Sequence, residues 1–191
     1  MEYFVWKALA GKGAAVLTEL KNVDNSVDIK RGRKLLVPIA KDAYFEMNPQ
    51  YPKDILLEDQ VSNMDYMVVV SPKLTEFLIQ SNLAQVEYFP VSIKNHKGVP
   101  HQEKYTIVHP TKVIDCIDKS KSDLMWNKID PDIISGCYEL VLDTDKIGED
   151  DIIFRAKHLE TFVIVREDLA EEIKELGFTG VNMKEIDEFE A

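Results

Sequence analysis

The sequence predicts an α+β fold with a largely antiparallel sheet, two main amphipathic helices and a single compact domain. Three observations lead to this prediction. Short runs of β-branched and aromatic residues recur along the 191-residue chain, and such runs favour strands. Most of them follow one another without a helix between, which is typical of antiparallel pairing. Two apolar runs lead directly into stretches with helical spacing of apolar residues.

The first strand–helix unit covers residues 66–82. The apolar run 66–70 predicts a buried strand. Ser71 and Pro72 then predict a helix start, because serine caps helix N-termini and proline is tolerated at the first helical position. Apolar side chains at helical spacing predict one buried face for the helix over 73–82. That face consists of Leu74, Phe77, Leu78 and Ile79.

The second unit covers residues 162–177. Its run 162–165 predicts a strand, and Glu167 and Asp168 then open a helix, since acidic side chains stabilise the positive end of the helix dipole. Gly177 is a natural end for this helix. The buried stripe is predicted to consist of Leu169, Ile173 and Leu176.

Other short apolar runs predict further strands. They are residues 3–6, 35–39, 86–91, 105–108, 113–118, 138–142 and 152–154. Pro38 places its run at a sheet edge or bulge, and Pro90 is expected to break the strand that contains it. Residues 119–132 predict a polar connection, and Gly180 predicts a strained turn. The tail 185–191 is expected to be frayed.

Length and composition limit the domain organisation. A chain of 191 residues is long enough for one well-buried core and short for two independent ones. A composition shift over residues 48–65 predicts an internal boundary. On this prediction residues 1–60 form an N-terminal strand and loop subdomain, and residues 61–191 form the main α+β domain.

Hydrophobic residues make up 45% of the chain, which is typical of a globular protein. The apolar runs are far shorter than the roughly 20 residues of a membrane helix, and the first residues lack the pattern of a secretory signal. We therefore expect a cytoplasmic protein without a membrane partner. Cys116 and Cys137 are expected to be buried free thiols in a reducing compartment.

The charge of the chain is unevenly distributed. The net charge is −11, yet residues 1–53 carry nine basic and six acidic side chains. Residues 143–191 carry fifteen acidic and six basic side chains, a net of −9. An acidic face of this kind repels nucleic-acid phosphates and attracts basic partners. The alternative is that the acidic helix faces serve solubility alone.

No pattern in the chain predicts a reaction. Residues 11–13 lack the rest of a phosphate-binding loop and predict a turn. The histidines at 96, 101, 109 and 158 fall at no recognised metal-ligand spacing. Acidic neighbours would raise the pKa of the Cys116 thiol, which makes it a poor nucleophile. The basic cluster 30–34 lacks interleaved aromatic residues and predicts a solvated loop. We predict no catalytic, cofactor-binding or metal-binding residue, and no cofactor.

Residues 65–183 contain a series of short segments whose order is distinctive. Two are the most specific: Ile153-Phe154-Arg155 and Gly177-Phe178-Thr179-Gly180. The others are 68–74, 86–91, 105–110, 116–122, 140–143 and 162–165. This series resembles an immunity-protein family of bacterial polymorphic toxin systems, first described as a domain of unknown function. The resemblance implies a non-enzymatic cytoplasmic protein that binds and neutralises a cognate toxin through a protein–protein interface.

The resemblance also directs the choice of a partner surface. Toxins that attack nucleic acids or anionic lipids tend to be basic, so we expect a basic toxin as partner and no nucleic-acid partner; self-association is left open. The candidates for the binding face are the acidic residues Asp150, Asp151, Glu171, Glu172 and Glu175. Two other functions stay open: a small hydrolase or transferase with an unrecognised site, and an assembly protein that pairs through exposed sheet edges.

Overall fold

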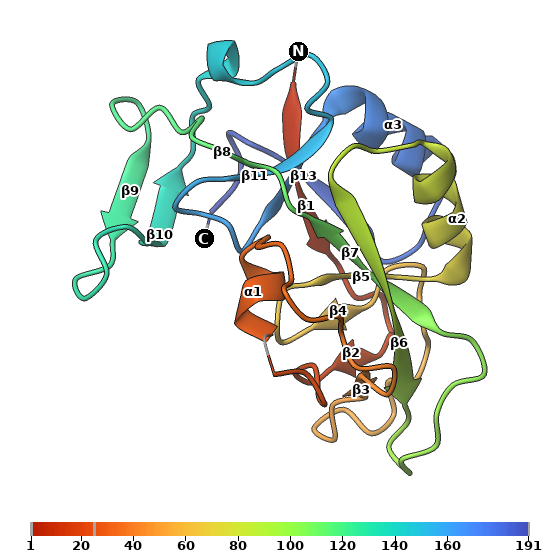
Figure 1. Cartoon of the computed structure of the whole chain (residues 1–191). Helices are drawn as coiled ribbons and strands as arrows, with labels where there is room; N and C mark the ends of the chain where they lie inside the picture. Colours follow the sequence, from red (N-terminus) through yellow and green to blue (C-terminus); the bar gives the residue numbers. More distant parts are fainter. Residues whose placement is uncertain (1, 25, 191) are drawn as a thin grey trace.

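The computed structural model describes residues 2–24 and 26–190. In this part of the chain, strands outnumber helices and are divided among four sheets (Figure 1). The strands are β1 (Tyr3–Ala8), β2 (Val16–Leu17), β3 (Tyr44–Glu46), β4 (Ser62–Asn63), β5 (Val68–Val70), β6 (Val86–Lys94), β7 (Tyr105–Pro110), β8 (Val113–Ile114), β9 (Asp123–Trp126), β10 (Ile134–Glu139), β11 (Ile153–Ala156), β12 (Val163–Arg166) and β13 (Val181–Glu185). The helices are α1 (Ser26–Lys30), α2 (Pro72–Gln80), α3 (Glu167–Glu175) and the 3-10 turn η1 (Thr144–Lys146).

The largest sheet has five strands in the order β13-β1-β12-β11-β8. Strand β1 lies between β12 and β13 and is antiparallel to both, with Val5 opposite Ile164 on one side and Trp6 opposite Met183 on the other. Only β8 is parallel to its neighbour. A strand from residues 1–60 therefore lies between two strands of residues 61–191; the domain boundary at residue 60 stays a prediction.

The second sheet has the order β3-β6-β7-β5. Strands β6 and β7 form a long antiparallel hairpin, β5 is antiparallel to β7, and β3 is parallel to β6. Two further pairs, β2 with β4 and β9 with β10, stand as two-stranded sheets. The predicted mixture of helices with mainly antiparallel strands is confirmed, but the strands lie in several sheets instead of one.

The two larger sheets share a core. Alternate residues of β1 point to opposite faces, so Trp6 joins a cluster on one face while Val5 joins a different cluster on the other. The cluster around Trp6 also holds Val70 and Val108 of the second sheet, and the buried faces of α2 and α3. This shared core places both helices on the same side of the molecule (Figure 1).

Both predicted helices are confirmed. The Ser71 hydroxyl accepts a hydrogen bond from the Leu74 backbone N–H at 3.3 Å, and Pro72 takes the first helical position of α2. Helix α3 buries Leu169 and Ile173 and carries acidic residues in its first turn. Two residues predicted to be buried are exposed: Ile79 of α2 at 55% and Leu176 at the end of α3 at 49%. Gly177, just beyond α3, has a φ of 68°, the left-handed conformation in which glycine ends helices.

Several local predictions are wrong. Residues 35–39 form no strand, and Leu36 is 98% exposed, because no neighbouring strand pairs with this run. Part of the predicted polar connection is strand β9, which pairs with β10 in a hairpin that stands away from the body (Figure 1). Strand β6 continues through Pro90, opposite Thr106. The tail is anchored through Phe189, which is fully buried.

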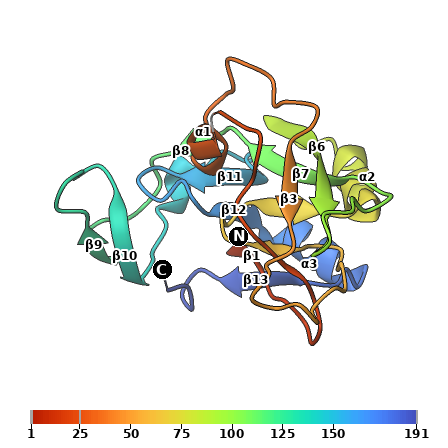
Figure 2. The same cartoon turned by 90° about the horizontal axis from the view of Figure 1, so that it is seen from below.

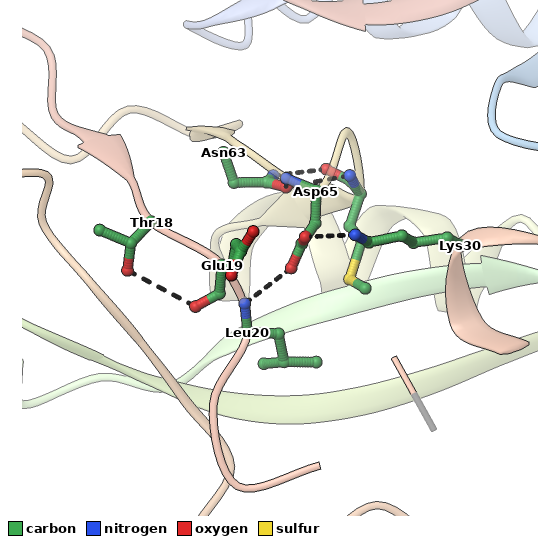
Figure 3. A network of polar contacts seen from close by, with 7 residues as sticks. Thr18, Glu19, Leu20, Lys30, Asn63 and Asp65 are labelled. Carbon is green, nitrogen blue, oxygen red and sulfur yellow. Dashed lines mark hydrogen bonds and ion pairs between the residues drawn. The ribbon is translucent and has the colours of Figure 1, made fainter. Parts of the chain in front are cut away.

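A buried polar network joins α1 to the turn between β4 and β5 (Figure 3). The Asp65 carboxylate pairs with the Lys30 ammonium at 2.6 Å and accepts a hydrogen bond from the Leu20 backbone N–H at 2.7 Å. The Asn63 side chain bridges the same turn, donating to the Met67 carbonyl oxygen and accepting from the Met67 N–H. These contacts satisfy groups that would otherwise be unpaired in the interior.

Buried His109 lies where α1, β6 and β7 meet. Its Nε2 is 3.0 Å from the Arg33 carbonyl oxygen, while its Nδ1 has no partner among the described residues. Burial lowers the pKa of His109 below the ordinary value of 6.5, and the positive charge of Arg155 acts in the same direction. The hydrogen bond to the Arg33 carbonyl oxygen opposes this effect, as does the carboxylate of Glu87, 3.9 Å from Nε2. The ring of Phe89 lies beside the imidazole, tilted by 41° with the ring centroids 5.5 Å apart.

We expect acid to destabilise the fold through His109. Its folded pKa is below its unfolded pKa, so the unfolded chain binds a proton that the folded chain does not. The free energy of unfolding should therefore fall as the pH drops below 6.5. Replacement of His109→Gln removes this titration. In urea unfolding, the difference in the free energy of unfolding between the wild type and the variant should be constant above about pH 7.5. Near about pH 5.5, the wild type should have lost stability relative to the variant. Parallel pH profiles would contradict the prediction.

Three further observations concern the cysteines, membrane-spanning helices and clusters of metal-binding side chains. Cys116 and Cys137 are both free and buried, as predicted, and burial raises the pKa of Cys116 to about 11. In the described ranges 2–24 and 26–190, no helix has the length and apolar content to cross a membrane. Over the same ranges, no three His, Cys, Asp or Glu side chains are grouped so as to hold a metal ion.

Candidate partner-binding surface

Three of the five predicted acidic residues lie on the exposed side of α3. The helix buries Leu169 and Ile173 against the shared core, and helical spacing then places Glu171, Glu172 and Glu175 toward solvent. All three glutamates are exposed, and none has an ion-pair partner among the described residues. Helix α3 therefore presents uncompensated negative charge.

The other two predicted residues precede β11 and differ from each other. Asp150 is exposed, whereas Asp151 is half-buried. The Asp151 carboxylate forms an ion pair with the Lys112 ammonium at 3.4 Å and accepts a hydrogen bond from the Gly148 N–H. This carboxylate is already compensated, so it is less available to a partner than Asp150.

A groove of about 310 Å³ is lined by residues of both α2 and α3. Its apolar lining comes from Phe77, Leu83, Ile152 and Leu169. Its polar lining comes from Gln80 and Ser81 on one side, and from Asp168 and Glu172 on the other. Of the five predicted acidic residues, Glu172 lines the groove. Ile152 also lines the groove and belongs to the same segment as Asp150.

Asp168 belongs to this surface although it was predicted only as a first-turn residue of the helix. The Arg166 guanidinium contacts its carboxylate through two hydrogen bonds, of 2.8 and 2.7 Å. This bidentate contact holds the pKa of Asp168 below its usual value. Arg166 also donates to the Glu149 carbonyl oxygen, so it ties the start of α3 to the loop before β11.

The groove suits binding better than chemistry. The groups whose pKa values are displaced furthest are Cys116, Tyr88, Tyr105, Asp118 and Arg155. None of them lines this groove or the other four pockets described. The apolar lining residues together with the Glu172 carboxylate instead fit the aliphatic stem and charged end of a lysine or arginine side chain.

The α+β fold and the mixed lining of the groove are compatible with a protein that binds another protein. A comparison with family models identifies it more closely. Residues 38–188 match the Immunity protein family (Imm11), and the chain belongs to this family. The match confirms the resemblance seen in the sequence and extends it beyond residues 65–183; it includes α2, α3 and the groove. A comparison with curated proteins finds no match.

Proposed function

We propose that this chain is a non-enzymatic immunity protein that binds a toxin of a polymorphic toxin system and neutralises it through a protein–protein interface. One observation supports this role above the others: a member of the immunity family carries a groove that is lined partly by apolar residues and holds the exposed carboxylate of Glu172. The proposed partner is a basic protein, encountered in the cytoplasm. Its lysine or arginine side chains would enter the groove.

Charge supports the same proposal. Glu171, Glu172 and Glu175 have no ion-pair partner within the described part of the chain, and the chain carries a net charge of −11. A surface of one sign steers an oppositely charged partner during diffusion, and this raises the association rate more than it changes the final affinity. The apolar residues that line the groove would supply the desolvated contacts that slow dissociation.

The test uses the toxin encoded beside this chain's gene, produced with and without this protein. The toxin should stop growth when expressed alone, and co-expression should restore growth. A variant with all five predicted residues neutralised, Asp150→Asn, Asp151→Asn, Glu171→Gln, Glu172→Gln and Glu175→Gln, should associate about tenfold more slowly at low salt. Most of this loss should disappear at high salt, because screening already removes the steering.

A matched control separates this surface from net charge. Five other exposed carboxylates give the same change in charge: Asp24→Asn, Asp123→Asn, Glu19→Gln, Glu103→Gln and Glu139→Gln. The control should associate nearly as fast as the wild type. Equal rates for the two variants would show that α3 is not the binding face, and failure of the wild type to restore growth would overturn the proposed function itself.

A further inference from the structure

Strand β13 is an open edge of the five-stranded sheet. It pairs with β1 on one side and has no strand on the other among the described residues. Figure 2 shows it at the rim of the molecule, below β1. An open edge leaves backbone donors and acceptors available to another chain.

The other edges of the two larger sheets are short or covered. Strand β8 has only two residues. The outer side of β5 is bridged by Gln60 opposite Val70, and that of β3 by Lys21 opposite Tyr44. Strand β13 has five residues, and residues 2–24 and 26–190 form no such bridge on its outer side. It is therefore the edge at which an additional strand could pair.

The register shows which groups of β13 point outward. The Leu9 N–H donates to the Gly180 carbonyl oxygen at 2.9 Å, so this pair is hydrogen-bonded. Because bonded and non-bonded pairs alternate in an antiparallel ladder, Asn182 bonds to β1, whereas Val181 and Met183 direct their N–H and C=O groups away from it. The outward groups of Val181 and Met183 have the spacing that an added strand requires.

Two pockets flank this edge on opposite faces of the sheet. One, of about 300 Å³, lies on the helix face and is lined mainly by Ile173, Phe178, Val181 and Met183, with Lys174 at its side. The other, of about 350 Å³, is bounded by apolar residues of the opposite core, Tyr3, Leu140, Leu142 and Ile186. Successive side chains of a strand point to opposite faces, so an added strand would reach both pockets.

The second pocket has a strongly acidic rim. Glu2, Glu185 and Asp187 line it, and its lining contains no lysine or arginine. A basic side chain could place its aliphatic stem on the apolar floor and its charge among these carboxylates. The pocket on the helix face instead suits a large apolar side chain.

We propose that β13 receives an extended segment of the toxin as a sixth strand of this sheet. This inference rests on the proposed function and adds a second contact beside the α3 surface. The segment carries a large apolar side chain for the helix-face pocket and a lysine or arginine for the opposite pocket. A second copy of this chain is disfavoured, because its own β13 would bring Glu185 and Asp187 against the same acidic rim.

The decisive variant is Met183→Pro. Proline removes the outward N–H of residue 183 and leaves the bonds between β13 and β1 in place, and it is tolerated at sheet edges on the exposed side. Met183→Ala is the matched control, since it also removes the side chain but keeps the N–H. The proline variant should bind the toxin about tenfold more weakly than the alanine variant, the effect of losing one backbone hydrogen bond.

Hydrogen exchange gives a readout that needs no substitution. The amides of Val181 and Met183 should become protected when the wild type binds the toxin. If the wild type binds the toxin while these amides stay unprotected and the two variants bind equally, the inference is wrong and the α3 surface stands. If the wild type binds no toxin, the proposed function fails first. A wild-type dimer that Met183→Pro disrupts, with toxin binding unchanged, would assign the edge to a second copy.

Discussion

Replacing Arg155 with alanine should lower the free energy of unfolding by about 3–5 kcal/mol. Arg155 lies on β11 with 3% exposure, and burial lowers its pKa to about 10. It forms no ion pair among the described residues. All its hydrogen bonds go to backbone carbonyl oxygens, those of Ile29, Lys30, Pro110, Glu160 and Thr161.

These carbonyl groups come from three separate parts of the chain: the end of α1, the end of β7 and the connection from β11 to β12. One guanidinium satisfies all of them, with its shortest contact, 2.6 Å, to Glu160. Alanine would leave buried acceptors without donors, each at a cost of about 1–3 kcal/mol, and would leave a cavity as well. The fork of donors is specific to arginine, so Arg155→Lys should recover only part of the loss.

Urea unfolding checks this prediction, with Arg33→Ala as the control. The Arg33 side chain is more than half exposed and contacts Asp28 at 3.2 Å. Such a surface pair contributes at most about 1 kcal/mol. The stability of the Arg155 variant should therefore fall well below that of the control. A loss of similar size in both variants would mean that the buried guanidinium does not hold these three segments together.

The second large effect is expected for Gly180→Ala, which should cost about 3 kcal/mol or more. Gly180 has a φ of 75°, and an added Cβ would lie 2.1 Å from the Gln60 carbonyl oxygen. The surrounding contact is rigid, because the Gln60 N–H donates to the Thr179 carbonyl oxygen and the Asp59 carboxylate accepts from the Thr179 N–H. The backbone would have to separate where residues 59–60 meet the start of β13.

Gly98→Ala distinguishes the clash from backbone strain. Gly98 has nearly the same φ, 74°, but no atom lies within 4 Å of its added Cβ. Its substitution should lower the free energy of unfolding by about 1 kcal/mol, which is the cost of placing alanine in the left-handed conformation. The difference between the midpoints of the urea unfolding curves of Gly180→Ala and Gly98→Ala measures the clash alone. Equal losses would show that the segment 59–60 can move aside.

Features set by neighbouring residues could be predicted from the sequence. The start of α2 depends on Ser71 and Pro72, the end of α3 on Gly177, and the turn at Gly180 on a single residue type; all four have the predicted roles. The prediction of a strand over residues 35–39 is wrong, because a strand needs a neighbouring strand to pair with, and an apolar composition alone does not provide that neighbour. Strand β9 was missed although Leu124 and Trp126 alternate with exposed residues, since the alternation is only four residues long.

The same distinction applies to the candidate surface: its local features could be predicted from the sequence, whereas features that join distant residues could not. The exposure of Glu171 and Glu175 follows from the helical period of α3 alone. The groove does not, because it requires α2 and α3, separated by more than eighty residues, to pack on one core. The ion pair of Asp151 with Lys112 also depends on distant parts of the chain meeting.

The position of β1 has a consequence for biosynthesis. The ribosome makes this strand well before its two neighbours, β12 and β13, which end at Arg166 and Glu185. The largest sheet can close only after the chain has emerged as far as Glu185. Such distant pairing is slow to form, because loop closure precedes the contacts that reward it. The largest sheet of a newly made chain therefore forms late, and under the proposed function only chains that have completed it would bind the toxin.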